Sequence, residues 1–120
     1  MAYDKIDIDV RTYDFALRVL DIVDSIPNTH SGNTVARQLA RSGTSIGANV
    51  EESRSGESRL DFIHKLNIAL KESRETHYWL RIVRDKKMVR PAGLSELIQE
   101  AEEIKKILGA SVRTAKNNKK

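Results

Sequence analysis

The 120-residue sequence has no cysteine, only two prolines and few aromatic side chains. Without cysteine, the chain can form neither a disulfide framework nor a thiolate metal site. No apolar run approaches the roughly 20 residues that span a bilayer, and the first ten residues alternate acidic and apolar side chains, unlike a secretory signal. We therefore expect one cytoplasmic domain over residues 1–120 without membrane association, with a short flexible N-terminus at 1–9 and a basic tail at 116–120.

The net charge of +4 is unevenly distributed. Residues 1–34 hold three basic and six acidic side chains, whereas residues 55–90 hold nine basic and five acidic ones. A basic surface favours polyanions such as nucleic acid, but the same charge also keeps a protein in solution. Composition therefore leaves both interpretations open.

Four segments have helical periodicity, and none shows the alternation of a strand. We expect helices at about residues 10–26, from Asn33 or Thr34 to 53, from 58 to 85, and from Ala92 or Ser95 to 115. Pro27 ends the first helix, and Ser58 with Asp61 has the spacing of a capping box. Long helices with short connections predict an all-α fold, an antiparallel up-down-up-down four-helix bundle.

Helical wheels assign a core face to each helix. The first helix has one row of Phe15, Val19, Ile22 and Ile26 and an adjacent row of Ala16, Leu20 and Val23. The core stripe of the second is Leu39, Ser42, Ile46 and Val50. The last helix has a seam of Leu94, Leu97, Ile98, Ala101, Ile104, Leu108 and Val112.

Two glycines interrupt the second helix within RSGTSIGANVEES, residues 41–53. Each should cost about 1 kcal/mol relative to alanine in a helix interior. Gly43 and Gly47 fall beside the core stripe and make a strip with almost no side-chain bulk, which allows another helix to approach closely. That helix belongs either to the same bundle or to a neighbouring subunit. Ser42 and Asn49 fall on the core side, where we expect them to form structural hydrogen bonds.

The third helix has two apolar faces. One contains Leu66, Leu70 and Leu80, and the other gathers Ile68, Glu72, Glu75, Trp79 and Val83. A monomeric bundle needs only one such face, so the second predicts a subunit interface. The alternative is that Trp79 covers an edge of the monomer core.

No arrangement of residues indicates catalysis. Asp61 and His64 form a single carboxylate-x-x-histidine pair, whereas a di-metal bundle requires two such pairs. His64 lies on the polar side of its helix, and His77 on the apolar side is more typical of a satisfied core histidine. Because no nucleophile elbow or phosphate-binding loop occurs either, we expect no enzyme, no metal, no cofactor and no small-molecule substrate.

Basic residues form two groups at opposite ends of the predicted bundle. The first, at the joint between the third and fourth helices, is Arg81, Arg84, Lys86, Lys87 and Arg90. The second, at the end of the fourth helix, is Arg113, Lys116, Lys119 and Lys120. Either group could contact phosphates in a salt-sensitive, sequence-independent way, although any single residue is equally compatible with ordinary surface charge.

Two stretches resemble a known family: ARQLARSGTSIGANVEES at residues 36–53 and DFIHKLNIALKESRETHYWLRIV at residues 61–83. They closely resemble the bacterial four-helix-bundle proteins encoded in intervening sequences of 23S rRNA genes. The resemblance covers nearly the whole chain and implies an antiparallel bundle that assembles as a homopentameric ring. The family is also similar to the accessory protein of diversity-generating retroelements, a basic pentamer that works with a reverse transcriptase and nucleic acid.

The resemblance supplies no catalytic residue. It marks seven positions as family motif, with a structural role: Ser42, Gly43, Ser45, Ile46, Gly47, Asn49 and Glu52. Taken together, we expect a non-catalytic oligomeric protein that binds nucleic acid, with structured RNA such as rRNA favoured. The alternative is a protein-interaction scaffold with no nucleic-acid role.

Overall fold

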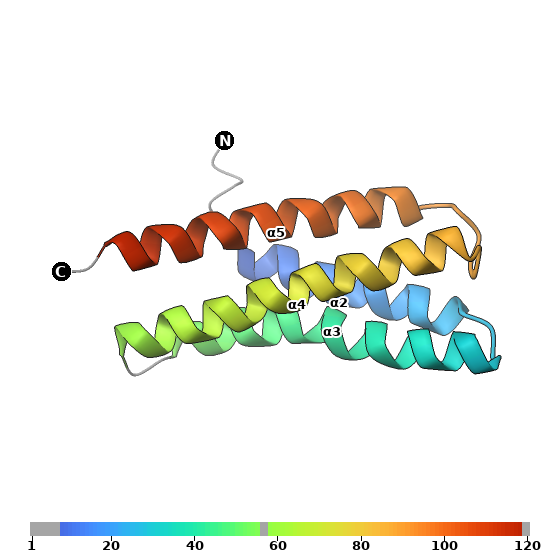
Figure 1. Cartoon of the computed structure of the whole chain (residues 1–120), viewed down its shortest axis with the longest axis horizontal. Helices are drawn as coiled ribbons and strands as arrows, with labels where there is room; N and C mark the ends of the chain where they lie inside the picture. Colours follow the sequence, from blue (N-terminus) through green and yellow to red (C-terminus); the bar gives the residue numbers. More distant parts are fainter. Residues whose placement is uncertain (1–7, 56–57, 119–120) are drawn as a thin grey trace.

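The computed structural model describes residues 8–55 and 58–118. It contains helices α2 (Ile8–Ser25), α3 (His30–Arg54), α4 (Arg59–Asp85) and α5 (Leu94–Asn117), and no strand within these described residues. Successive helices run in opposite directions along an elongated body of 51 × 30 × 18 Å (Figure 1). The predicted all-α four-helix bundle is therefore confirmed. None of the described helices combines the length and apolar character needed to cross a bilayer.

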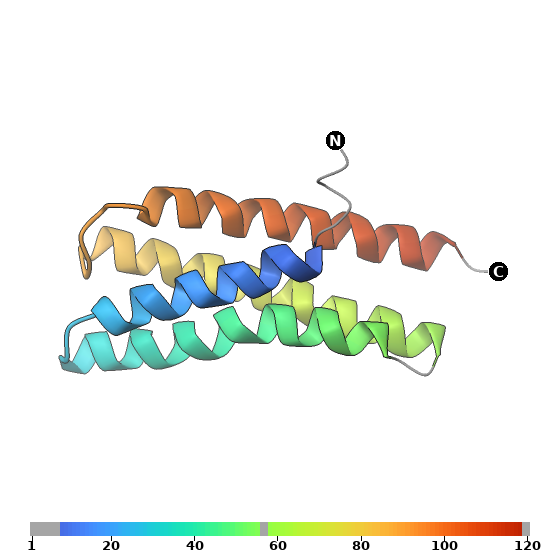
Figure 2. The ribbon, with the colours of Figure 1, turned by 180° about the vertical axis from the view of Figure 1, so that it is seen from behind.

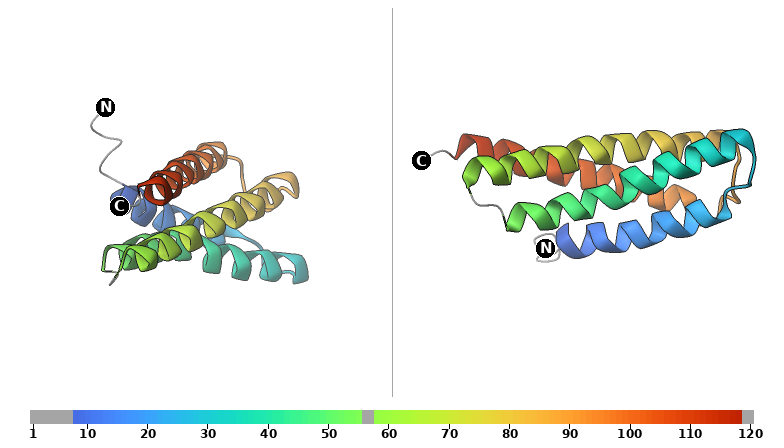
Figure 3. Two further views of the ribbon diagram at one scale, coloured as in Figure 1. Left: turned by 60° about the vertical axis from the view of Figure 1, so that its left-hand side comes forward. Right: turned by 90° about the horizontal axis from the view of Figure 1, so that it is seen from below.

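Each helix packs on the one that precedes it in the chain. In the view from below, α3 lies between α2 and α4, and α5 packs behind α4 (Figure 3). A thinner contact joins α5 back to α2, so α2 and α4 occupy opposite corners of the bundle. From behind, α2 crosses only part of the length of the bundle, consistent with its 18 residues against 24 to 27 in the others (Figure 2).

The start of α3 differs from the expectation. Thr29 is its N-cap, because the Thr29 hydroxyl oxygen accepts a hydrogen bond from the Gly32 N–H at 2.9 Å. Placing the cap at Asn33 or Thr34 was therefore wrong. The first turn of α3 is polar and mostly exposed, so apolar periodicity begins only at Val35, after the helix is already under way.

The other helix ends agree better with the sequence. Ser58 caps α4 by accepting a hydrogen bond from the Asp61 N–H at 3.1 Å, as its spacing predicts. α5 starts at Leu94 after Gly93, whose φ of 75° is a conformation that glycine adopts without strain. The last helix continues to Asn117, so the predicted tail at 116–120 begins too early. Residues 1–7, 119 and 120 of the predicted termini lie outside the described residues.

The core lies along the axis of the bundle and contains most of the predicted stripes. Every residue of the predicted α3 stripe is fully buried, and so is nearly all of the α5 seam, with Ile98 only partly covered. α2 contributes Phe15 and Val19. In the second predicted row of α2 only Leu20 was wrongly placed inside: it is 38% exposed, whereas Val23 packs against the core, as do Ile22 and Ile26 of the first row.

Candidate functional site

The glycine strip of α3 faces α2 of the same chain. A Cβ atom added to Gly43 would lie 2.6 Å from Cγ1 of Val19, and one added to Gly47 would lie 3.2 Å from Oγ1 of Thr12. Thr12 is itself buried and donates its hydroxyl hydrogen to the Ile8 carbonyl at 2.8 Å. The strip therefore brings two helices of one bundle together, which settles the choice that the sequence left open.

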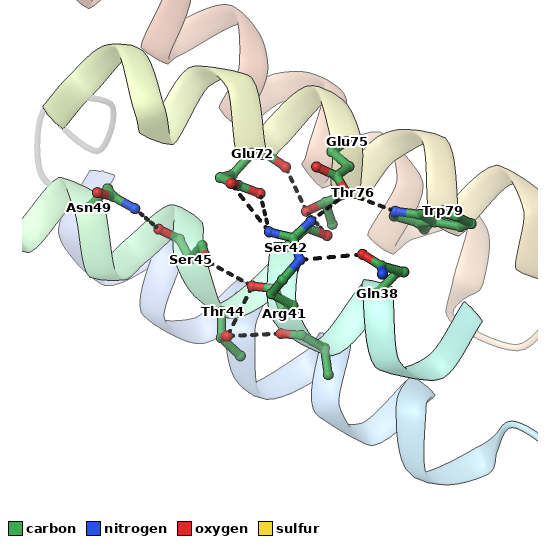
Figure 4. Close-up of polar contacts among 11 residues, drawn as sticks. Gln38, Arg41, Ser42, Thr44, Ser45, Asn49, Glu72, Glu75, Thr76 and Trp79 are labelled. Atoms are coloured by element: carbon green, nitrogen blue, oxygen red, sulfur yellow. Dashed lines mark hydrogen bonds and ion pairs between the residues drawn. The ribbon is translucent and has the colours of Figure 1, made fainter. Parts of the chain in front are cut away.

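A polar network joins α3 to α4 next to this strip (Figure 4). The guanidinium of Arg41 reaches from α3 to two carboxylates of α4: its Nη1 lies 3.2 Å from Oε1 of Glu72, and its Nη2 pairs with Glu75. Trp79 donates its indole N–H to Glu75 Oε2 at 3.2 Å. Since Glu72 is almost completely buried, Arg41 supplies the counter-charge that this carboxylate needs inside the protein.

The network also shifts pKa values. Burial pushes the pKa of Glu75 upward, but hydrogen bonds from Arg41 and Trp79 outweigh it, so the pKa ends below its usual value. The hydrogen bond to Glu75 raises the pKa of Arg41. Both groups therefore stay charged, and the network holds two helices together rather than exchanging protons near neutral pH.

The remaining motif residues also serve the packing of α3. The Thr76 hydroxyl of α4 lies 2.9 Å from the Ser42 hydroxyl in the buried interface. Ser45 donates to the Arg41 carbonyl at 2.7 Å, and Asn49 donates to the Ser45 carbonyl at 2.8 Å, each one turn back in the same helix. Ile46 is in the core, and Glu52 is exposed. Six of the seven motif positions thus have a packing or hydrogen-bonding role within the monomer.

The second face of α4 does not need another subunit to cover it. α4 packs with one side on α3 and with another on α5, so both of its apolar faces are used within one chain. Val83 is fully buried and Glu72 is 8% exposed, while Ile68, Glu75 and Trp79 are half-buried. The premise that a monomer needs only one face of this helix was wrong, and Trp79 packs at the edge of the monomer core.

The first group of basic residues separates into two kinds. Arg84 forms an ion pair with Asp85 at 2.8 Å, and the guanidinium of Arg81 lies 5.9 Å from the centre of the Tyr78 ring. The joint cations, which we define as Lys86, Lys87 and Arg90, are exposed and have no ion-pair partner within residues 8–55 and 58–118.

Lys87 has an unusual backbone conformation. Its φ of 55° is the left-handed conformation in which a helix commonly ends, with the Met88 N–H bonded to the Val83 carbonyl at 3.0 Å. Glycine is the usual residue at such a position, because a side chain there costs about 1 kcal/mol or more. The chain thus keeps a cation at a position where glycine would be more stable.

A surface hollow of about 600 Å³ lies between the end of α2 and this joint. Its lining includes the apolar side chains of Ile22, Met88 and Val89 and the cations Lys87 and Arg90. Most of its lining belongs to the connection at residues 86–93, which runs from the end of α4 to the start of α5. The arrangement offers apolar side chains with cations beside them.

The second basic group lies at the other end of the bundle. Arg113 and Lys116 are exposed on the last turns of α5, whereas Lys119 and Lys120 lie outside the described residues. Arg59 donates to the Ala115 carbonyl at 3.2 Å, which anchors this end of α5 to the start of α4. As predicted, the two basic groups are at opposite ends, so they cannot form one continuous surface within a monomer (Figure 1).

The two histidines of α4 have different environments. His64 is exposed, as expected. His77 is half-buried, with Nε2 3.5 Å from Oε1 of Glu102. Burial, followed by the positive charge of Arg81, lowers the pKa of His77. His77 is therefore a packing residue that is neutral at pH 7.

Comparisons with known proteins identify relatives that share the fold. The family described as 23S rRNA-intervening sequence protein matches residues 4–110. A crystal structure of a protein with unknown function, from the S23 ribosomal protein family of Bacteroides thetaiotaomicron, is similar to this chain with 36% sequence identity and a TM-score of 0.80. The match covers 89% of this chain and 96% of that one. None of the curated proteins matches the sequence.

Proposed function

Since the chain belongs to the 23S rRNA-intervening sequence protein family, we propose that it is a non-catalytic cytoplasmic protein that assembles with copies of itself and binds structured RNA. The observation that carries the proposal is the set of joint cations, two of which line a hollow of mixed polar and apolar character. Cations without an ion-pair partner among the described residues contribute fully to phosphate binding, because no internal ion pair has to be broken first. Arg84 and Arg81 are already engaged and contribute less.

The hollow favours RNA with unpaired bases over a regular duplex. Unpaired bases can leave the stack and contact protein side chains while cations bind the adjacent phosphates. Proteins recognise most single-stranded RNA loops in this way. Here Ile22, Met88 and Val89 would supply apolar contacts, Arg90 a guanidinium plane on which a base can stack, and Lys87 a charge for the phosphate. Lys87 supports the same conclusion, because a strained non-glycine residue often marks a functional position.

Assembly strengthens the proposed binding. A single patch of three cations gives modest affinity, but several copies that contact one RNA add their contributions if their spacing matches the RNA. The resemblance to the family implies five copies. A protein of this kind presents repeated basic patches, and we propose that it organises a folded RNA rather than reading a sequence.

Binding to a hairpin RNA with an unpaired loop, across a salt series, tests the proposal. Changing both Lys86 and Lys87 to glutamine should weaken binding and reduce the slope of log affinity against log salt by about 0.7 to 0.9 per lost phosphate contact. The matched control changes Arg37 and Lys106, which are exposed elsewhere, and removes the same charge. A third variant neutralises Arg113 and Lys116 and shows what the other basic end contributes.

One substitution separates binding from folding. Lys87→Gly should weaken RNA binding while raising the free energy of unfolding, because glycine relieves the left-handed backbone at this position. Equal loss of affinity in the Arg37 and Lys106 control would show that only net charge matters and would overturn the assignment of the joint. If the wild-type protein does not bind RNA at low salt, the RNA function is rejected and the alternative, a protein-interaction scaffold, is favoured.

A further inference from the structure

The outer face of α2 has an exposed apolar row that the monomer leaves uncovered. Its members are spaced three, four and three residues apart and are exposed by 65, 63, 48 and 38%, respectively: Val10, Tyr13, Leu17 and Leu20. This is the spacing of a helix that packs along another helix. We call this row the α2 stripe.

Next to the α2 stripe, small residues of α3 make a hollow of about 310 Å³. Thr44, Gly47 and Ala48 form its α3 side, and Asp9 and Glu51 lie at its rim. Asp14, Asp21 and Asp24 are exposed on the same side of α2. Asp9 and Asp14 are neutralised by ion pairs with Arg54 and Arg18, so the negative charge of the face comes from Asp21, Asp24 and Glu51. The face therefore combines apolar residues, room for a large side chain and a net negative charge.

The opposite corner of the bundle has the complementary properties. Four exposed residues of α4 have the same three, four, three spacing, and we call them the α4 stripe: Lys71, Arg74, Tyr78 and Arg81. Three of them are cations, and Tyr78 is 49% exposed. Glu75, which lies on the flank of this row, is neutralised by its ion pair with Arg41.

Tyr78 is held in position from behind. Its ring packs edge-on against Trp79, with the ring centres 5.0 Å apart, and Trp79 is itself fixed by its hydrogen bond to Glu75. Arg81 lies over the Tyr78 ring. Tyrosine and arginine are enriched among the residues that dominate binding energy at interfaces, and a side chain that is already ordered loses less entropy on binding.

We propose that the α2 stripe of one copy binds the α4 stripe of the next copy, with Tyr78 entering the hollow beside Gly47. The partner is a second copy because the basic α4 stripe carries the charge that complements the acidic α2 face, and Tyr78 is an ordered side chain that can enter the hollow. Pairing α2 with α2 would place acidic faces against each other. The inference rests on the proposed self-assembly and assigns its two surfaces.

The two stripes are on opposite corners, so each copy uses one surface to bind its predecessor and the other to bind its successor. Such head-to-tail contacts close into a ring or continue as a filament, unlike a two-fold dimer. The Gly47 position thus serves twice: its α2-facing side lets Thr12 approach, and its outward side leaves room for the partner.

Sedimentation velocity of the full chain without nucleic acid tests the proposal with two variants. Leu17→Asp places a charge in the α2 stripe, and Tyr78→Asp places one in the α4 stripe. Each variant should be monomeric, with self-association at least tenfold weaker than wild type. An equimolar mixture should form a species of two chains and nothing larger, because one intact surface of each kind remains. Leu60→Asp, at a 77% exposed residue outside both stripes, should assemble like wild type.

Several results would overturn the proposal: a monomeric wild type, assembly of either variant alone, or no species of two chains in the mixture. Assembly of Tyr78→Asp alone would show that α2 pairs with α2. A monomeric Leu60→Asp would show that association depends only on apolar exposure. The double change of Lys86 and Lys87 to glutamine should keep the wild-type mass, so loss of RNA binding and loss of assembly are measured separately.

Discussion

Replacing Gly43 with alanine tests whether the glycine strip exists for close packing. The new Cβ would lie 2.6 Å from Cγ1 and 3.1 Å from Cγ2 of Val19, which is fully buried. An ordinary carbon contact is about 3.5 to 4 Å, so α2 or the valine must move by about 1 Å. Overpacking of this kind costs about 1 to 3 kcal/mol, and the better helix propensity of alanine returns about 1 kcal/mol. We expect a net loss of about 1 kcal/mol in the free energy of unfolding.

Gly109 supplies the control within the same protein. A Cβ at Gly109 would meet only the end of the Arg113 side chain, at 3.9 Å, so Gly109→Ala should stabilise the fold by about 0.5 to 1 kcal/mol. In a Val19→Ala background, Gly43→Ala should cost less than in the unmodified protein, because both contacts with the Cγ atoms are removed and only the 3.2 Å contact with Cβ of residue 19 remains. Urea unfolding followed by circular dichroism resolves these effects as midpoint shifts of about 0.5 M. If Gly43→Ala stabilises the unmodified protein as much as Gly109→Ala does, the close-packing argument is refuted.

Two further predictions concern charged groups in α3 and α4. Arg41→Met leaves the buried Glu72 carboxylate without its partner and should lower stability by about 1 to 2 kcal/mol, with partial recovery when Glu72→Gln is added; unchanged urea midpoints would contradict this. Because the pKa of His77 is lowered in the folded protein, the unfolded chain takes up a proton first as the pH falls below about 6.5, and the fold loses stability. As the pH is lowered from about 7.5 to 5.5, the melting temperature of His77→Gln should therefore rise relative to that of the wild type. A difference in melting temperature that does not change with pH would refute the assignment.

Periodicity predicted the fold well because most of the core is regular. The fully buried stripe of α3 and the seam of α5 repeat at helical spacing, so a wheel is sufficient to find them. The cap at Thr29 was missed because the first turn of α3 has no buried apolar residue at the start of a pattern. Apolar periodicity detects a helix only where the helix buries apolar side chains, so it does not detect a helix end that is polar.

It was harder to predict which apolar helix faces are covered, for a different reason. A wheel shows which side of a helix is apolar, but it does not show what covers that side. α4 has two neighbours in its own chain, so its second face at Val83 is core. α2 presents the opposite case: Leu20 was assigned to the inside by its spacing, yet the face that contains Leu17 and Leu20 has no neighbour within the described residues. Only the positions of all the helices distinguish an apolar face that is covered from one that is exposed.

The order of packing along the chain also determines how the protein folds. Each helix contacts mainly its neighbours along the chain, and the connections between them span residues 26–29, 55–58 and 86–93. Native contacts therefore require only short loops to close, which is the property of fast-folding helical proteins. A nascent chain can form the α2–α3 hairpin and extend it by one helix at a time as synthesis proceeds. Because the contact between α5 and α2 is the thinnest in the bundle, we expect it to form last and open first, with the fastest exchange of backbone amide hydrogens along that edge.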